Sequence, residues 1–355
     1  MTDSRLSDSL SSEQSAASTH PFIRDDVGNA LLLDRRRELF PLHPLIKTSV
    51  ALPTPPVGEL YVDLKRVVLL RDTGCCVSAP SGFGKSFALS LIRSQFEADF
   101  PGIPVYKHSV FIHRAESVRA FFKHFLETAR NGNTAGETYD LRSRLAHTLV
   151  DDTRYSDFGL VLLLVDEAQD MLMSDYGFLK DVYNALADEG VRLIVILMGE
   201  SPRFELQLEQ LANDARADLI NRFTRRQLSF RPIQTVKDIQ IVLREIDNAT
   251  FPPSPALKWT EFFFPSAFRM GFRLEQECGR FADVLARMNG SRGKAAGYPA
   301  KQVFSAIRAL VVDNAGYDAP GMQLPDVAWD RAVQWAKMQD ALDLANATAM
   351  PEVKV

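Results

Sequence analysis

Between residues 57 and 233, apolar positions alternate between a helical spacing and short continuous runs. Residues 57–70 place apolar side chains three and four apart, which predicts a helix that ends before Gly74. Gly-Cys-Cys-Val-Ser-Ala at 74–79 is a short apolar run that predicts a buried strand. Further strands are expected at 103–112, 159–172 (ending in its acidic residues), 191–200 and 225–233, with helices at 83–100, 115–130, 138–155 and 178–190. This alternation predicts an α/β fold with a parallel sheet.

Changes in this pattern divide the chain. Residues 1–20 are rich in serine and weakly patterned, which predicts a disordered tail. Residues 21–56 predict an N-terminal extension that ends in an extended, proline-rich connector. Residues 57–234 form the expected α/β core. The remaining pattern is almost wholly helical, which predicts a helical domain at 235–320 and a C-terminal helix or tail at 321–355.

Composition and charge narrow the function classes. The chain has 355 residues, a net charge of −4 and a pI of about 5.9, which excludes a basic nucleic-acid coat protein. DNA binding would need a local patch or an assembled oligomer. Three cysteines do not make a disulfide framework, and no apolar stretch has the length of a signal peptide or a membrane span. We therefore expect a cytoplasmic protein without a membrane segment.

The segment 79–86 follows the phosphate-loop pattern G-x-x-x-x-G-K-[ST], except that Ala79 replaces the first glycine. Alanine is compatible with this position if its φ stays negative, because the position serves the turn and does not contact phosphate. Lys85 supplies a charge for the β and γ phosphates, and Ser86 supplies a hydroxyl for Mg²⁺. The alternative, a chance glycine-rich turn, is disfavoured by the strand before it and the helix after it. We expect the loop to bind ATP through Ala79, Pro80, Ser81, Gly82, Phe83, Gly84, Lys85, Ser86 and Phe87.

Two carboxylates, Asp166 and Glu167, end the apolar run that begins at residue 159. Ligands of parallel sheets bind at the carboxyl ends of the strands. We expect Asp166 to hold Mg²⁺ through water and Glu167 to polarise the attacking water. By themselves the two residues would be explained as solvated acids at a strand end, but together with the phosphate loop they predict a site for ATP and Mg²⁺.

The loop at 79–86, Val-Asp-Glu-Ala-Gln at 165–169, the strand at 193–200 and the segment 219–226 together resemble AAA+ ATPases. More narrowly, they resemble the TnsC/TniB/IstB group of transposition-regulating ATPases, to which the Mu B protein is a functional relative. The resemblance covers about residues 55 to 290. It implies an αβα sandwich with a parallel sheet, followed by an α-helical lid, with ATP at the boundary between subunits.

The resemblance also implies roles for single residues. Arg222 matches the position of the family's arginine finger, which reaches the ATP of a neighbouring subunit and stabilises transition-state charge. A surface arginine in an ion pair is the alternative. Arg273 matches the second sensor, with Arg280 as the alternative, and both Glu200 and Ser201 stay open for the first sensor.

DNA contacts are implied in the stretch after the second strand. There Lys107, His108, His113 and Arg114 offer groups for phosphate contact. The alternative is a solvated strand edge and helix start.

The implied function is ATP-dependent assembly of an oligomer or filament on double-stranded DNA, which recruits a transposase and works with a target-selector protein. ATP hydrolysis would then disassemble it. Two alternatives are an ATPase switch or chaperone-like motor without DNA, and a replication initiator or helicase loader. The expected helix at 325–347 carries Trp329, Trp335 and Met338, which predict either lid core or a docking surface for a partner.

Overall fold

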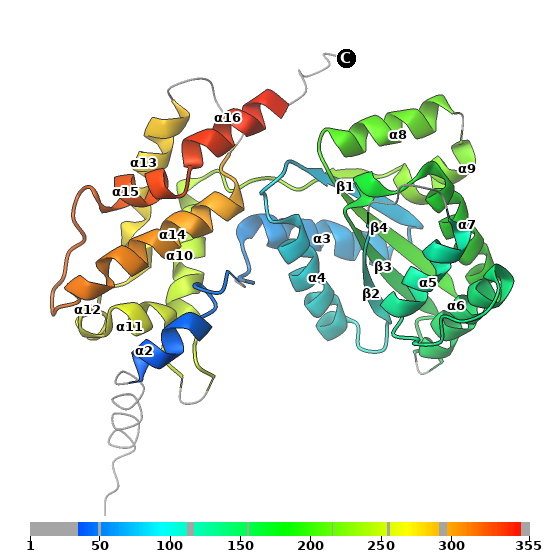
Figure 1. Ribbon diagram of the computed structural model, residues 1–355, viewed down its shortest axis with the longest axis horizontal. Helices are drawn as coiled ribbons and strands as arrows, with labels where there is room; N and C mark the ends of the chain where they lie inside the picture. The colour runs from blue at the N-terminus through cyan, green and yellow to red at the C-terminus, as the bar shows by residue number, and fades with distance from the viewer. Residues whose placement is uncertain are drawn as a thin grey trace, which may run out of the picture.

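A computed structural model shows a parallel sheet with helices on both faces and a helical region beside it (Figure 1). It describes residues 35–48, 51–111, 117–154, 156–214, 216–253, 256–290 and 297–348. Within these ranges, no helix combines the length and the apolar composition that crossing a bilayer requires.

The sheet has five parallel strands in the order β2-β3-β4-β1-β5. Their bounds are β1 Gly74–Ala79, β2 Val105–Ser109, β3 Leu160–Asp166, β4 Arg192–Glu200 and β5 Gln227–Ser229. All seven residues of β3 are buried, as expected of a strand that is covered on both faces. The α/β fold predicted from the sequence is confirmed.

Helices cover the two faces of the sheet in separate groups. One face carries α3 (Pro55–Leu69) and α4 (Lys85–Asp99). The other carries α5 Val118–Thr128, α6 Thr138–Asp152, α7 Met173–Asp188, α8 Arg203–Asn213 and the short α9 Ala217–Leu219. The alternation of strand side chains divides the core: Leu162 packs with the first group and Leu163 with the second.

The helical region comprises residues 236–348 and lies on the other side of α3 and α4 from the main body of the sheet (Figure 1). Its helices are α10 Val236–Asn248, α11 Trp259–Phe263, α12 Pro265–Arg269, α13 Cys278–Asn289, α14 Ala300–Asn314, α15 Ala328–Trp335 and α16 Met338–Thr348. A capping box between Thr235 and Asp238 begins α10. These helices share one apolar core.

The C-terminal segment differs from the single helix expected at 325–347. The chain turns between α15 and α16, where Lys337 takes a left-handed φ of +54°. Trp329 is buried and stacks on Phe281 at 4.0 Å, and Met338 is buried in the same core. Trp335 is 76% exposed, so the aromatic residues of this segment divide between core and surface.

The N-terminal segment packs on the helical region and not on the sheet. It contains α2 (Arg36–Leu39) and a 3₁₀ turn at Phe40–Leu42, and Leu45 belongs to the core of the helical region. The proline-rich stretch expected to be an extended connector is helical from Pro55, which takes the first helical position of α3.

His43 anchors this segment in the helical region. Its ring is fully buried against the rings of Phe251, Trp259, Phe262 and Phe263, with centroids 4.8 to 5.1 Å away. Nδ1 accepts a hydrogen bond from the backbone N–H of Leu45 (3.2 Å), and within the described residues Nε2 has no partner. Burial lowers the pKa of His43 to about 3, so the ring is neutral in the folded protein.

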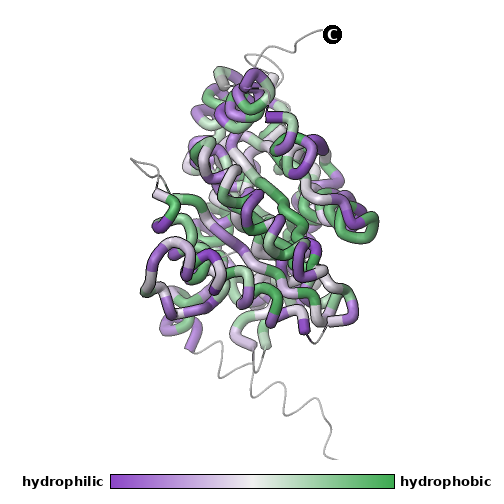
Figure 2. The backbone as a smooth tube through the Cα atoms, turned by 90° about the vertical axis from the view of Figure 1, so that its right-hand side faces the viewer, coloured by the Kyte–Doolittle hydropathy of each residue, from purple (hydrophilic) through white to green (hydrophobic). Residues whose placement is uncertain are grey.

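The distribution of hydropathy agrees with these cores. In Figure 2, hydrophobic stretches of the backbone run through the middle of the molecule, and hydrophilic stretches are frequent on its outer turns.

The burial of neutral His43 predicts a dependence of stability on pH. The folded pKa lies below the unfolded value of about 6.5, so the stabilisation is complete above pH 6.5 and is lost as the pH falls toward 3. At pH 5 this loss amounts to about 2 kcal/mol. The free energy of unfolding, measured by calorimetry, should therefore be lower at pH 5 than at pH 7. We expect His43→Leu to remove the part of this difference that comes from His43. The exposed His147 provides the control, since His147→Leu should retain the full difference.

Candidate nucleotide-binding site

The loop between β1 and α4 has the backbone that phosphate binding requires. An alanine fits the first position of the loop only if its φ is negative. Ala79 meets this condition, because it is the last residue of β1 and its backbone is extended. Gly82 and Gly84 take left-handed φ values of +80° and +88°, which favour glycine. Helix α4 begins at Lys85, so its first N–H groups and the positive end of its dipole face the loop.

Lys85 is buried inside this loop. Its Nζ donates to the carbonyl oxygens of Ala79 (3.2 Å) and Pro80 (3.1 Å) and lies 3.9 Å from a carboxylate oxygen of Glu200. Burial lowers the pKa of Lys85, and the carboxylates of Glu200 and Glu167 oppose that shift. A cation held in this position is available to a phosphate.

Asp166 and Glu167 lie at the carboxyl end of β3, as predicted. Asp166 is buried, and Glu167 takes a left-handed φ of +58°, which is uncommon for a residue with a side chain. Gln169 connects Glu167 to the neighbouring strand: its Nε2 donates to Glu167 Oε2 (2.8 Å), and its Oε1 accepts from the N–H of Glu200 (2.7 Å). Gln169 is the last residue of the Val-Asp-Glu-Ala-Gln segment at 165–169, but no role was expected of it.

Lys107 lies beside these residues and not on a surface for DNA. Its Nζ is 3.3 Å from Asp166 Oδ2 and donates to the carbonyl oxygen of Ser86 (2.9 Å) and to Ser90 Oγ (3.1 Å). The cause is the pairing of β2 with β3 beneath α4, which places Lys107 between the strand end and the helix. The expected DNA contact is therefore corrected: Lys107 neutralises Asp166.

His108 is also turned inward. It is 5% exposed, its ring stacks on Phe125 at 4.4 Å, and Nδ1 lies 2.8 Å from Thr128 Oγ1. Because its ring is buried in this packing, His108 does not offer the DNA contact expected of it. The other two expected DNA contacts, His113 and Arg114, lie outside the described residues.

A cavity of about 480 Å³ opens over the phosphate loop. Three parts of the chain line it: the N-terminal segment and the start of α3, the core, and α14 of the helical region. Its lining residues are Leu45, Thr48, Leu52, Thr54, Val57, Ser81, Gly82, Phe83, Gly84, Lys85, Ser86, Phe87, Ala88, Leu91, Glu167, Glu200, Phe230, Ala300, Lys301, Phe304 and Arg308. One cavity thus combines the phosphate loop and two carboxylates, Glu167 and Glu200, with apolar walls, which suit an aromatic base.

Helix α14 brings two further cations to the cavity. The backbone N–H of Lys301 donates to the carbonyl oxygen of Gly82 (3.0 Å), and a Cβ built on Gly84 would lie 3.5 Å from Cβ of Ala300. Lys301 and Arg308 are seven residues apart, so they lie two turns apart on one face of the helix with Phe304 between them. The sequence shows from this spacing that the two cations share one face of a helix. It does not show that this face of α14 meets the cavity.

Arg273 and Arg280, the two candidates for the second sensor, do not line the cavity. The guanidinium of Arg273 lies 3.5 Å from the ring centroid of Phe268 and donates to the carbonyl oxygens of Phe268 and Phe272. Arg280 pairs with acidic residues of its own region. Lys301 and Arg308 of α14 line the cavity instead. Of the two candidates for the first sensor, Glu200 lines the cavity and Ser201 does not.

Arg222 lies at the far end of β1 from the phosphate loop. It sits in a π-helical turn, Ile220–Thr224, where its Nη1 donates to the carbonyl oxygen of Asp218 (3.1 Å). Its own carbonyl accepts from Thr73 Oγ1 (2.6 Å), and Thr73 precedes β1. The six residues of β1 span about 20 Å, so this arginine does not serve the phosphate loop of its own chain.

The residues beside the loop fit Mg²⁺ as part of a nucleotide complex. Ser86 offers a hydroxyl and Asp166 a carboxylate, which are the hard oxygen ligands that Mg²⁺ prefers, and the ammonium of Lys107 already lies against the carboxylate. Across the described ranges, no group of three or more His, Cys, Asp or Glu side chains could hold a metal ion. Ser86 and Asp166 alone would be an incomplete ligand set, which water and phosphate oxygens would complete.

Comparison with known proteins agrees with the fold. Residues 71–208 match the family model of the AAA domain, which spans the phosphate loop, Asp166 and Glu167. The parallel sheet with its flanking helices and the helical C-terminal region form an α/β fold of the AAA+ type. The match and the site together support an AAA+ ATPase. No curated protein matches the sequence.

Solved structures with a similar fold have low sequence identity. The Aeropyrum pernix ORC1 protein in complex with DNA is 14% identical, with a TM-score of 0.46 over 79% of this chain and 63% of that one. Domain III of the Thermotoga maritima replication initiation protein DnaA is 14% identical, with a TM-score of 0.45 over 81% and 95%. A Drosophila ORC chain bound to DNA is 15% identical, with a TM-score of 0.44 over 94% and 70%. This chain thus covers less than two thirds of the ORC1 chain.

The contact between Lys107 and Asp166 predicts a loss of stability when the cation is removed. Lys107→Met leaves a buried carboxylate unpaired, and because Lys107 is 19% exposed we expect a cost of about 2 kcal/mol, below the fully buried range. The thermal midpoint should fall by about 4–8 °C. Adding Asp166→Asn should restore part of it, because the unpaired charge is then gone.

Lys65 provides a matched control, since it pairs with Asp99 on the surface. Lys65→Met should change the midpoint little. A midpoint for Lys107→Met equal to that of the wild type would show that Lys107 does not neutralise Asp166.

Proposed function

We propose that this protein hydrolyses ATP at a site shared between subunits, and that ATP-dependent assembly on double-stranded DNA lets it regulate transposition. The observation that carries the ATPase part is the meeting of Lys85, Glu167 and Glu200 with the lid cations Lys301 and Arg308 around one cavity. Support for the DNA and transposition part is the resemblance of its motifs to the TnsC/TniB/IstB group.

The chemistry follows from the placement of these side chains. The loop N–H groups and Lys85 bind the phosphates, and Lys301 and Arg308 add positive charge from above. Glu167, oriented by Gln169, accepts a hydrogen bond from the attacking water and aims it at the γ-phosphate. Ser86 and Asp166 would hold Mg²⁺, which would supply positive charge to neutralise the phosphates. Phe87, Phe230 and Phe304 offer apolar surface to the base.

Arg222 completes the site in this proposal from a neighbouring subunit. It lies at the far end of β1 from its own loop, and its guanidinium contacts the carbonyl oxygen of Asp218 and the ring of Tyr183 in the single chain. In the oligomer it would leave these contacts and reach the γ-phosphate of another copy. Assembly and hydrolysis are coupled in this way, and hydrolysis disassembles the oligomer. A transposase and a target-selector protein are its partners in this role, and the cytoplasm is its place.

The alternative is a replication initiator or helicase loader, or an ATPase switch without DNA. The transposition regulator and both alternatives would use the same nucleotide site. Binding to DNA and binding to a transposase are therefore the properties that distinguish them.

The central experiment compares two variants in a mobility shift of labelled duplex DNA with ATP. Lys85→Ala removes a phosphate ligand, so nucleotide binding and the DNA shift should both be lost. Glu167→Gln keeps shape and hydrogen bonding but loses the base, so hydrolysis should fall by about 10²–10⁴-fold while the DNA shift persists. The matched control is Glu189→Gln, an exposed glutamate at the end of α7.

A DNA shift that is equal with and without ATP would contradict assembly driven by nucleotide. If ATP is hydrolysed and DNA is never shifted, the ATPase switch replaces the DNA-bound regulator.

Mixing two inactive variants tests the shared site. Arg222→Ala keeps an intact phosphate loop, and Lys85→Ala keeps an intact arginine, so a mixed oligomer contains some complete sites. We expect the mixture to hydrolyse more ATP in the presence of DNA than either variant alone at equal total concentration. An arginine finger is worth about 10³-fold or more in rate, so the gain should be measurable. A mixture that only averages the two rates would show that Arg222 does not act between subunits.

A further inference from the structure

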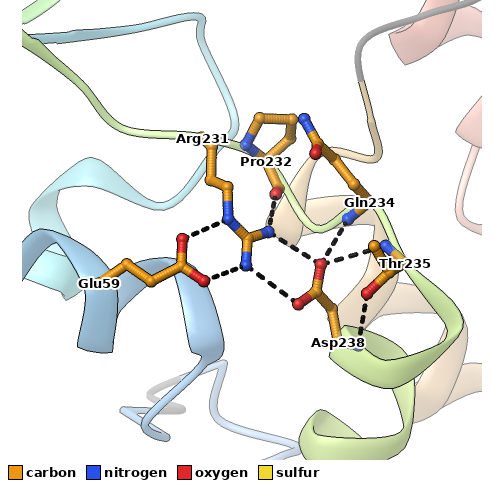
Figure 3. Close-up of polar contacts among 6 residues, drawn as sticks. All are labelled: Glu59, Arg231, Pro232, Gln234, Thr235 and Asp238. Carbon is orange, nitrogen blue, oxygen red and sulfur yellow. Dashed lines mark hydrogen bonds and ion pairs between the residues drawn. The ribbon is translucent and has the colours of Figure 1, made fainter.

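One arginine joins the core to the helical region at the point where the chain passes between them. Arg231 follows β5 and precedes α10. Its guanidinium contacts two carboxylates at once, Glu59 on α3 and Asp238 on α10 (Figure 3). Glu59 belongs to a helix that packs on the sheet, and Asp238 to the first helix of the helical region, so the two ends of this bridge are on different sides of the boundary.

Both contacts are bidentate. Nε and Nη2 donate to Glu59 at 2.5 and 2.6 Å, and Nη1 and Nη2 donate to Asp238 at 2.8 and 3.1 Å. Nη1 also donates to the carbonyl oxygen of Pro232 (3.0 Å). A planar guanidinium is able to serve two carboxylates in this way, whereas a lysine ammonium is not. We call this arrangement the Arg231 bridge.

The carboxylate on the helical side is itself held rigidly. Asp238 is 4% exposed and accepts from the backbone N–H groups of Gln234 (2.9 Å) and Thr235 (3.1 Å). Burial acts to raise the pKa of Asp238, but the hydrogen bonds from Arg231 and from these two N–H groups lower it to about 2. Arg231 therefore binds a fixed, ionised group that is part of the cap of α10.

The segment after Arg231 is tied to the start of α14. Tyr298 N–H donates to the carbonyl oxygen of Ile233 at 2.7 Å. Gly297 lies so close to this segment that a Cβ would meet Cγ of Pro232 at 2.5 Å and the carbonyl oxygen of Ile233 at 2.8 Å. Three residues after Tyr298, the backbone N–H of Lys301 donates to the carbonyl oxygen of Gly82 in the phosphate loop. A short series of backbone contacts thus connects the bridge to the loop.

The bridge also lies directly behind the cavity. Phe230, which precedes Arg231, and Val57, two residues before Glu59, both line it. We propose that Arg231 is a positioning residue that sets the angle between the core and the helical region, and so keeps Lys301 and Arg308 over the phosphate loop. Its effect on nucleotide affinity rests on the function proposed above; its effect on the angle does not.

The test measures the angle first and affinity second. Nitroxide labels are attached at Tyr139→Cys on the core and Met270→Cys on the helical region, both strongly exposed positions. Cys278→Ser removes the partly exposed thiol, and buried Cys75 and Cys76 stay unlabelled. Distance distributions between the labels are recorded by pulsed electron spin resonance for the wild type, Glu59→Gln and Arg231→Lys.

Without nucleotide, the wild type should give one narrow distribution, and both variants a broader or displaced one. Asp63→Asn is the matched control, because Asp63 is exposed on the same helix α3 and has no ion pair within the described ranges; it should match the wild type. Thermal unfolding of Glu59→Gln should stay close to that of the wild type, since Glu59 is 58% exposed. This separates a change of angle from a loss of fold.

The affinity for a fluorescent ADP analogue should be about fivefold weaker in Glu59→Gln and Arg231→Lys, as expected for an ion pair of good bidentate geometry. Distributions identical to that of the control would overturn the bridge. Altered distributions with unchanged affinity would overturn its role at the cavity. A wild type that binds no nucleotide would overturn the proposed function, and the distance distributions alone would still decide whether Arg231 sets the angle.

Discussion

The common direction of the five strands is the constraint on which the site depends. Because β1, β3 and β4 run parallel, the phosphate loop, Asp166 with Glu167, and Glu200 all emerge at one edge of the sheet. The strand order then decides their neighbours: β4 lies between β3 and β1, so Glu200 has Gln169 on one side and Lys85 on the other. No single motif contains this arrangement, because it arises only when the strands pair.

What could be predicted from the sequence was chemistry carried by contiguous residues. The phosphate loop and the Asp166–Glu167 pair each directly follow, in the sequence, the apolar strand that positions them. The parallel sheet could be predicted because strand and helix patterns alternate along the chain. Lys301 and Arg308 were missed because their spacing defines a helix face, while the element that this face meets is more than 200 residues away in the sequence. Lys107 was assigned to DNA because the resemblance implies DNA contacts near the second strand, and its contact with Asp166 exists only once β2, β3 and α4 are packed together.

The terminal helices show a different limit of the pattern. Apolar residues at helical spacing continue through 325–347, and neither glycine nor proline marks a break there. The break occurs at Lys337, where a left-handed φ lets Trp329 and Met338 enter one core while Trp335 stays outside. Packing of the whole helical region determines this turn, so local propensity could not have located it.

The N-terminal segment gives the cavity a wall that depends on the rest of the chain. Leu45 lines the cavity and is also buried in the core formed by α10 to α16, and its neighbour His43 rests on rings from residues 251 to 263. During synthesis these residues leave the ribosome before the helices of the helical region that hold them. A nascent chain therefore exposes its phosphate loop before all the walls of the cavity exist. Because a ligand stabilises only a state that binds it, a nucleotide bound at this cavity would protect the incomplete chain less than the finished protein.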